Sequence, residues 1–408
     1  MGWVALRRVF ATLAPGIFII GYIVGTGSVT TMSSAGASYG MSLAWTLALA
    51  SFFTHIMVVA ISRLTVLSGE TLLSLFRRHF GMPVTALVIV SLAATQITSI
   101  IGVMAIVVEV FGEWCLTALG LAPDPVLAAA GFTAFLIGLY WVGRHAFFLK
   151  VLAALVGVMG LAFFVTAGVV LPDLRELAAG MVPNVPAAGN PRLLIAGMVG
   201  TTMASVVLFS RSILVREEGW RAADLPVANR DSAVSMTVLF FINAAIMACA
   251  AGTLHRQGME IEAAIDMVKT LEPLAGSLAT GGFVLGIVAA GLSSLFPNYL
   301  LGPWIVADVL RLPRTMTGPI FRALVLGAAL CGLVVPVLGG RPVQIMIASQ
   351  AVSPIAMPLL AGFVLRLLNN PSVCGGRAPS RLLNVGLGVT VVFSVYMSFV
   401  ALSGFWGD

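Results

Sequence analysis

The sequence predicts an all-α polytopic membrane protein built from two inverted five-helix repeats and an eleventh helix. The 408-residue chain is 59% hydrophobic and only 9% charged, whereas a soluble domain has about 25% charged residues. Apolar runs long enough to cross the ~30 Å of bilayer hydrocarbon recur along the chain. Two of these runs are interrupted at corresponding places, five runs apart, which is typical of secondary transporters with inverted repeats.

The apolar runs define eleven expected spans. Spans 1–5 form the first repeat, about 9–171, and spans 6–10 form the second, about 192–367. The eleventh span is peripheral, and residues 1–408 make a single transmembrane domain. The runs cover residues 9–40, 42–66, 83–111, 126–143, 147–171, 192–215, 233–254, 277–305, 319–338, 343–367 and 382–404, with the broken first and sixth runs counted once each.

Basic residues predict how the chain is oriented, because Lys and Arg accumulate on cytoplasmic loops. An arrangement with the N-terminus in the cytoplasm and the C-terminus outside places all but five of the 22 basic residues on the inner side. We therefore expect an integral protein of the bacterial inner membrane in this orientation. The net charge of +6 is then explained by loops that face anionic lipid headgroups, and no nucleic-acid partner is expected.

Several other classes of function have no support in the sequence. The chain has no P-loop, so ATP hydrolysis is not expected, and nothing indicates an enzyme or a cofactor. The four cysteines form no CxxC pair, which gives no basis for a disulfide framework or a thiolate metal site. The expected partners are a small ion or solute and the lipid bilayer. The sequence does not indicate the oligomeric state.

The first break lies in the run from Ala14 to Gly40, whose centre reads Gly25-Thr26-Gly27-Ser28. Each glycine weakens a helix interior by about 1 kcal/mol relative to alanine. Hydrocarbon has no partner for freed backbone groups, so an opened helix must line a cavity or hold a ligand. This stretch is therefore predicted to form half of a substrate site.

The second break lies in the sixth run, where Gly200, Thr201 and Ser205 are near the middle. Hydroxyl oxygens and freed carbonyls are hard donors, suited to a weakly held hard cation or to a neutral polar solute. We therefore predict Thr26, Ser28, Thr201 and Ser205 as ligands. Gly25, Gly27 and Gly200 are predicted to act as hinges.

Other polar residues within the spans are few. Gln350 lies in the tenth run beside Pro354 and Pro358, and in an inverted-repeat carrier that span borders the central cavity. Glu109 is the only acid counted well inside a span, near its outer end, where we expect it to reach water. The amides expected to hydrogen bond between helices are Gln96, Asn243 and Asn298.

Four stretches of the chain resemble the Nramp divalent-metal transporter superfamily, especially its divergent magnesium-transporting branch. The resemblance covers nearly the whole chain and implies a leucine-transporter-type fold and transport of divalent metal cations. The stretches are APGIFIIGYIVGTGSVTTMSSAGASYG, GMVGTTMASVVLFSRSILV, AAGLSSLFPNYLLGPWIVADVL and IMIASQAVSPIAMPLL.

The resemblance also implies site residues, with departures from the family pattern. The family's Asp-Pro-Gly-Asn motif falls on Gly25-Thr26-Gly27-Ser28, so the metal-binding carboxylate is absent. The Met-Pro-His motif falls on Ala204-Ser205-Val206, and the tenth-span glutamine is retained as Gln350. The resemblance thus adds Gly25, Ala204 and Gln350 to the substrate-binding residues. Thr26, Ser28 and Gln350 are the expected metal ligands.

The family's proton path is altered as well. Its acidic residues on the third span fall on Gln96 and Ser99, and its histidine on the sixth span falls on Arg211. None of these side chains exchanges protons near neutral pH. We therefore expect transport that is not coupled to protons by this route.

Three interpretations of the sequence stay open. The first is a carrier of divalent cations of the Mg²⁺ and Mn²⁺ type with a carboxylate-free site, in which the ion keeps most of its water. The second is a carrier of a small neutral or zwitterionic solute, for which Phe209 or Trp45 would form an aromatic lid. The third is a receptor or scaffold that does not transport. For a carrier, we expect alternating access through rocking of spans 1, 2, 6 and 7.

Overall fold

A computed structural model describes residues 14–142, 145–170, 173–271, 278–310 and 318–406, which contain helices and no strand. Nine of the described helical segments are long and apolar enough to cross a membrane. The expected first span is divided in two and the fifth is α7. The helices of the first half are α2 (Ala14–Ile23), α3 (Thr26–Tyr39), α4 (Ala44–Ser68), α5 (Leu72–Leu119), α6 (Pro125–Val142) and α7 (His145–Val169).

The second half begins after a short helix, α8 (Leu174–Gly180), and contains the remaining long helices. Residues 9–13 of the expected first span, 143 of the fourth, 171 of the fifth and 277 of the eighth lie outside the described residues. The helices are α9 (Pro191–Thr202), α10 (Ser205–Glu217), α11 (Leu225–Thr253), α13 (Leu278–Leu310), α14 (Pro319–Leu330), α15 (Val334–Leu338), α16 (Pro342–Ala351), α17 (Ser353–Leu368), α18 (Pro371–Cys374) and α19 (Arg381–Trp406).

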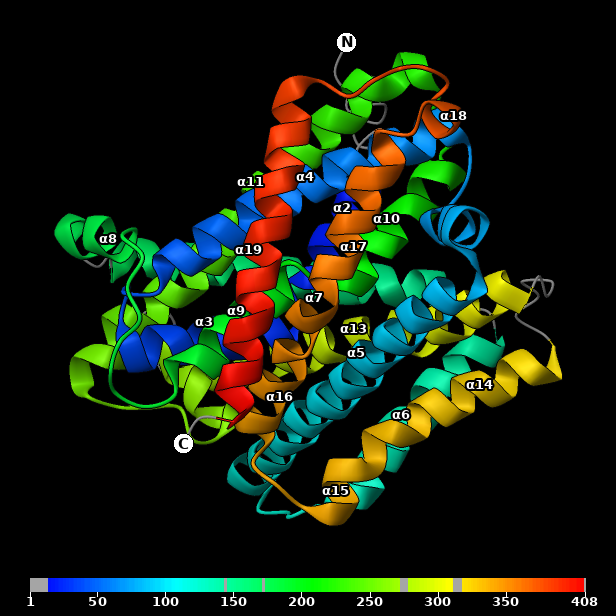
Figure 1. Cartoon of the computed structure of the whole chain (residues 1–408). Coiled ribbons are helices and arrows are strands. Elements are labelled where there is room, and N and C mark those ends of the chain that lie inside the picture. The colour runs from blue at the N-terminus through cyan, green and yellow to red at the C-terminus, as the bar shows by residue number, and fades with distance from the viewer. Residues whose placement is uncertain (1–13, 143–144, 171–172, 272–277, 311–317, 407–408) are drawn as a thin grey trace, which may run out of the picture.

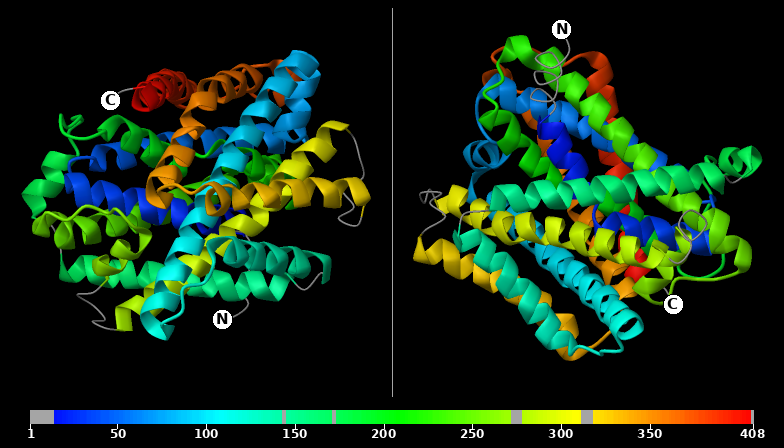
Figure 2. Two further views of the ribbon diagram at one scale, coloured as in Figure 1. Left: turned by 90° about the horizontal axis from the view of Figure 1, so that it is seen from below. Right: turned by 180° about the vertical axis from the view of Figure 1, so that it is seen from behind.

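The helices form one bundle whose connections alternate between two ends. The connection that contains α18 lies at one end of the molecule and α15 lies at the other (Figure 1). In the view from behind, α7 and α13 run side by side (Figure 2). The helix α19 packs on α17 and α9 at the edge of the bundle, and many of its apolar side chains are exposed, which fits contact with lipid.

The half-helix α3 lies in the middle of the bundle, where every residue from Thr26 to Ala37 is buried. It packs against α11, α9 and α16. Small side chains make this possible: a Cβ atom at Gly36 would overlap the carbonyl oxygen of Met247 on α11. Close approach between small residues is a common packing solution in membranes, where apolar burial does not drive association. The hydroxyl-rich stretch is therefore interior, as a site at mid-membrane requires.

Several observed boundaries differ from those expected. Within α5 a kink at Gly81, whose φ is 79°, separates the segment that begins at Leu72 from the segment that contains the expected third span, 83–111. The helix α11 begins at Leu225 rather than at residue 233, so the expected loop 216–232 is mostly helical. The connection between the fifth and sixth expected spans contains α8. Polar residues that cap or begin a helix on the membrane surface account for these errors, since hydropathy alone marks only the apolar part of a helix.

The tenth span is also divided, into α16 and α17. Pro354 has no N–H group, so the helical hydrogen bond to the carbonyl of Gln350 cannot form, and α16 ends at Ala351. The ninth span is divided by a 3₁₀ turn, Cys331–Leu333. Of the four divided spans, the first, sixth and tenth meet at the centre, where the sequence predicted two breaks, and the tenth keeps helical dihedral angles at Val352 (φ −69°, ψ −33°).

Candidate functional site

The first break separates α2 from α3 at Val24 and Gly25. Gly25 is extended, with φ −118° and ψ −169°, a conformation that any residue adopts. The carbonyl of Ile23 accepts hydrogen bonds from the Gly25 N–H at 2.8 Å and from Ser28 Oγ at 2.6 Å. A side chain thus satisfies a carbonyl that the broken helix leaves free.

The second break separates α9 from α10 at Met203 and Ala204. Ala204 is extended, with φ −65° and ψ 123°, so the carbonyls in the last turn of α9 lack donors from a next turn. Gly200 and Thr201 belong to that turn. Ser28 Oγ lies 3.1 Å from Thr201 Oγ1 in a hydrogen bond, which joins the two breaks directly.

Next to the third interruption, α16 packs closely against both breaks. A Cβ atom at Gly200 would overlap the carbonyl oxygen of Gln350, the carbonyl that Pro354 leaves without its helical donor. A Cβ atom at Gly27 would lie 2.8 Å from Met346 Cε and 3.1 Å from Gln350 Cδ. Gly27 and Gly200 therefore permit close packing against α16. The predicted hinge motion at Gly25, Gly27 and Gly200 stays a prediction.

A cavity of about 50 Å³ lies where the three interruptions meet α5 and α13. Among the described residues, none of the side chains that line it is charged. Most of them carry a hydroxyl or an amide. The polar lining residues are Thr95, Gln96, Ser99, Thr201, Ser205, Ser294, Asn298, Ser349, Gln350 and Ser353.

The structure brings most of the predicted site residues to this cavity. Those that line it are Gly25, Gly27, Gly200, Thr201, Ala204, Ser205 and Gln350. Two of the three expected metal ligands are not among the lining residues. Ser28 is held by Ile23 and Thr201, as described above, and the Thr26 methyl group lies against α13, 3.4 Å from the place of a Cβ at Gly291.

The polar faces of α5 and α13 were missed as part of the site. On α5 they consist of Thr95, Gln96 and Ser99, and on α13 of Ser294 and Asn298. Thr95 and Gln96 lie four and three residues before Ser99, and Ser294 lies four residues before Asn298, spacings that place residues on one side of a helix. That spacing was the available signal; the sequence analysis assigns Gln96 and Asn298 to hydrogen bonds between helices and does not consider Thr95 or Ser294.

The interhelical hydrogen bonds expected of the span amides are confirmed for two of them. Gln96 Nε2 donates to Asn298 Oδ1 at 2.6 Å and joins α5 to α13. Asn243 differs: it is buried on α11, and neither its Nδ2 nor its Oδ1 has a partner among the described residues.

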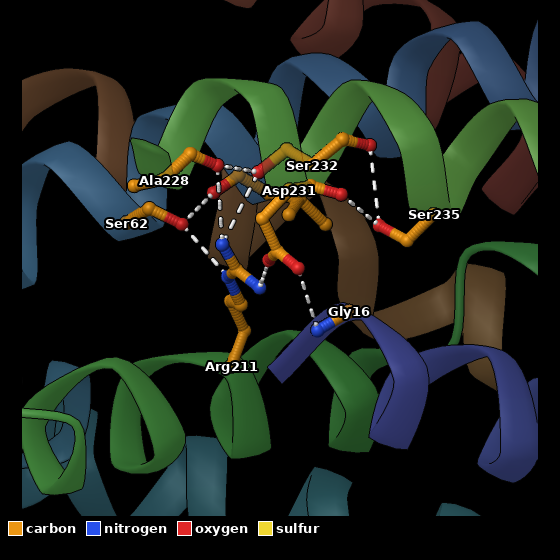
Figure 3. A network of polar contacts seen from close by, with 8 residues as sticks. Gly16, Ser62, Arg211, Ala228, Asp231, Ser232 and Ser235 are labelled. Carbon is orange, nitrogen blue, oxygen red and sulfur yellow. Dashed lines mark hydrogen bonds and ion pairs between the residues drawn. The ribbon is translucent and has the colours of Figure 1, made fainter. Parts of the chain in front are cut away.

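A charged cluster lies apart from the cavity, and its core is the ion pair between Arg211 on α10 and Asp231 on α11 (Figure 3). Both side chains are 0% exposed. We call this cluster the Arg211 network; its other members are Gly16, Ser62, Ala228 and Ser232. The prediction that Glu109 is the only acid well inside a span is therefore wrong. Asp231 is also buried, in the part of α11 that hydropathy did not mark.

Each guanidinium nitrogen of Arg211 and each carboxylate oxygen of Asp231 has a partner. Arg211 Nε donates to Ser62 Oγ at 2.8 Å, and Nη2 donates to Ser232 Oγ at 3.3 Å and to the carbonyl of Ala228 at 3.4 Å. The N–H of Gly16 donates to Asp231 Oδ1 at 3.1 Å. The Arg211 network thus connects α2, α4, α10 and α11, the first, second, sixth and seventh spans.

The other residues considered for the site lie elsewhere. Phe209 packs edge-on against Phe76, with ring centroids 5.7 Å apart, and the Trp45 Nε1 donates to the carbonyl of Asn184 at 3.0 Å. Neither ring lines the cavity. Glu109 accepts a hydrogen bond from the Ala264 N–H at 3.1 Å, so it holds a connecting segment.

Comparison with known proteins places these features in a family. A family model described as "Natural resistance-associated macrophage protein-like" (Nramp) matches residues 16–403. The "Divalent metal cation transporter MntH" of Erwinia tasmaniensis is 30% identical over 97% of this chain and 94% of its own length. The protein of the same description from Klebsiella pneumoniae is 29% identical over 97% of this chain and 94% of its own length.

Solved structures agree on the fold. The manganese transporter of Eremococcus coleocola has a TM-score of 0.76 at 16% identity, covering 100% of this chain and 90% of that one. Mhp1, a nucleobase-cation-symport-1 family transporter, has a TM-score of 0.56 at 16% identity, with coverage of 96% and 93%. These likenesses confirm the predicted leucine-transporter-type fold.

Proposed function

The chain belongs to the Nramp family, and we propose that it is a secondary transporter of divalent metal cations of the Mn²⁺ and Mg²⁺ type. The relatives named as divalent metal cation transporters support the cation class. The observation that carries the proposal is the small cavity of neutral oxygen groups at the meeting point of three interrupted helices. Such oxygens are the ligands that hard cations prefer.

The size of the cavity favours an ion over an organic solute. Its volume of about 50 Å³ has room for an ion with a few water molecules, since a buried water needs about 10–15 Å³ of such space. Sites for organic ligands are commonly about 300–1,000 Å³. Neither aromatic residue considered as a lid lies at the cavity, which removes the feature that would favour a zwitterionic solute.

We propose further that the cation is bound without a carboxylate. A divalent ion in a medium of low dielectric constant needs opposite charge or retained water. Here the ion would keep part of its hydration shell and receive carbonyl and hydroxyl oxygens from the helix breaks. The last turn of α9 contributes Gly200 and Thr201 to the lining of the cavity, and the negative end of a half-helix dipole favours a cation.

Transport is proposed to be independent of the family's proton route. At the three positions of that route, Gln96 and Ser99 are neutral, and Arg211 is held in its ion pair with Asp231. The expected measurement is Mn²⁺ uptake into proteoliposomes that contain a pH-sensitive dye. Internal acidification that follows Mn²⁺ entry and matches it in stoichiometry would contradict the proposal.

For the transport cycle, we propose that α2, α3, α4, α9, α10 and α11 rock against the remaining helices, with bending at Gly25, Gly27 and Gly200. The Arg211 network supports this grouping, because its hydrogen bonds connect four of the moving segments. The N-terminus is proposed to face the cytoplasm and the C-terminus the outside, from the distribution of basic residues.

The test of the proposed function is uptake of Mn²⁺, Mg²⁺ and Ca²⁺ into proteoliposomes by wild type, Gly25→Asp and Gly25→Ala. The backbone at residue 25 is extended, a conformation that any residue adopts, and Gly25→Ala controls for loss of the glycine without adding charge. We expect saturable uptake by wild type and tighter binding of the ion by Gly25→Asp. Uptake by Gly25→Asp alone would overturn the proposal and show that the wild-type substrate is another solute.

A further inference from the structure

Two amide side chains on the wall of the cavity hold each other in one orientation. Gln96 on α5 and Asn298 on α13 both line the cavity. Gln96 Nε2 donates to Asn298 Oδ1 at 2.6 Å and to the carbonyl oxygen of Asn298 at 3.1 Å. Both partners are acceptors, so the NH₂ group of Gln96 must face them.

The opposite orientation of the amide is excluded by the same contacts. Turning the Gln96 amide over would place its oxygen against two oxygens. Turning the Asn298 side chain as well would not compensate, because the backbone carbonyl oxygen of Asn298, 3.1 Å from Gln96 Nε2, is an acceptor in every orientation of the two amides. The oxygen of Gln96 must therefore point away from Asn298. It is buried and has no donor among the described residues.

Two hydroxyl groups that line the same cavity also lack a hydrogen-bond partner in the part of the chain that the structure describes. Ser205 Oγ on α10 and Ser294 Oγ on α13 are buried and have no hydrogen-bond partner among the described residues. The side chains of Gln96, Ser205 and Ser294 are 5%, 1% and 6% exposed. Buried polar groups without a partner are unfavourable unless a ligand satisfies them. Three of them lie on one cavity, on three different helices.

We propose that Gln96 is a direct ligand of the transported cation, together with Ser205 and Ser294, and that Asn298 is the residue that holds the Gln96 oxygen toward the ion. This assignment rests on the proposed function. It places part of the ion's coordination on α5 and α13, and not on the hydroxyls of Thr26 and Ser28. Because Asn298 occupies the NH₂ group, Gln96 offers the cavity an acceptor only, which favours a cation over a solute that needs donors.

The test is a double-mutant cycle on Mn²⁺ uptake, with Gln96→Met, Asn298→Leu and the double variant. Met keeps the approximate length of Gln and removes the acceptor. We expect Gln96→Met to raise the KM for Mn²⁺ about tenfold, which corresponds to the loss of about 1.4 kcal/mol, with little change in kcat. Asn298→Leu should raise KM by a similar factor. The double variant should be no worse than Gln96→Met alone, since Asn298 acts through Gln96.

Asn243→Leu is the matched control. Asn243 is also a buried amide without a partner among the described residues, but it does not line the cavity, so its replacement should leave KM at the wild-type value. Equal effects of Asn243→Leu and Asn298→Leu, or a wild-type KM in Gln96→Met, would overturn the ligand assignment while wild-type uptake upholds the proposed function. If wild type carries no cation, both proposals fall. If Asn298→Leu does not fold, Gln96→Met still decides the assignment.

Discussion

The cavity and the Arg211 network are two buried polar regions of the same bundle, and they differ in how their groups are satisfied. In the Arg211 network a full ion pair is surrounded by donors and acceptors within hydrogen-bond distance. In the cavity no lining side chain of the described residues is charged, and several acceptors have no partner. The chain therefore keeps its buried charge where no substrate is expected and leaves the cavity neutral.

This difference separates structural from functional burial of polar groups. A satisfied network stabilises one arrangement of helices, since removing either charge leaves the other buried alone. Acceptors without partners are unfavourable for the stability of the free protein and are available to a ligand. Mutations in the two regions should accordingly affect different measurements: unfolding for the Arg211 network, and uptake for the cavity.

The largest effect is expected from breaking the ion pair. Asp231→Ala leaves Arg211 charged and buried, which should destabilise the protein by about 3–5 kcal/mol and lower the Tm of the detergent-solubilised protein. The double variant Arg211→Met with Asp231→Leu should recover most of the loss, because no buried charge then stays unpaired. A Tm of Asp231→Ala equal to that of wild type would show that the pair does not hold the helices together.

A smaller effect is expected at the contact between α2 and the Arg211 network. A Cβ atom at Gly16 would overlap Asp231 Oδ1, whereas one at Gly21 on the same helix meets nothing within 4 Å. Gly16→Ala should therefore cost about 1–3 kcal/mol, and Gly21→Ala should be neutral or stabilise by up to about 1 kcal/mol. Thermal unfolding of both variants tests this contrast, and equal Tm values would contradict it.

The smallest change in stability, and the sharpest comparison, is expected from two serines beside the breaks. Ser28→Ala removes hydrogen bonds to Ile23 and Thr201 and should cost about 1 kcal/mol of stability. Ser205→Ala removes a buried hydroxyl without a partner, so stability should equal that of wild type or exceed it by up to about 1 kcal/mol, while the KM for Mn²⁺ rises. Unfolding and uptake are measured on the same preparations. A Ser205→Ala variant that is less stable than wild type but has a wild-type KM would contradict the assignment of the Ser205 hydroxyl to the ion.

The sequence by itself determined the class of the protein and the position of its breaks. Hydropathy is a sum over about 20 residues, so the apolar spans are evident without knowledge of packing. The glycine and hydroxyl residues at Gly25–Ser28 and Gly200–Ser205 marked two interruptions. An opened helix there must line a cavity or hold a ligand, because hydrocarbon has no partner for the freed backbone groups. The third interruption was also present in the sequence, since Pro354 removes the donor for the Gln350 carbonyl.

Tertiary structure alone decided which polar groups face the cavity and which have hydrogen-bond partners within the protein. Ser28 and Ser205 both lie beside a break, yet one is held by Ile23 and Thr201 while the other has no partner among the described residues. The pairing of Gln96 with Asn298 joins residues 202 positions apart, and that of Arg211 with Asp231 depends on where α11 begins. Such contacts are set by how helices pack and rotate against one another, and the local pattern along the chain contains no record of that geometry.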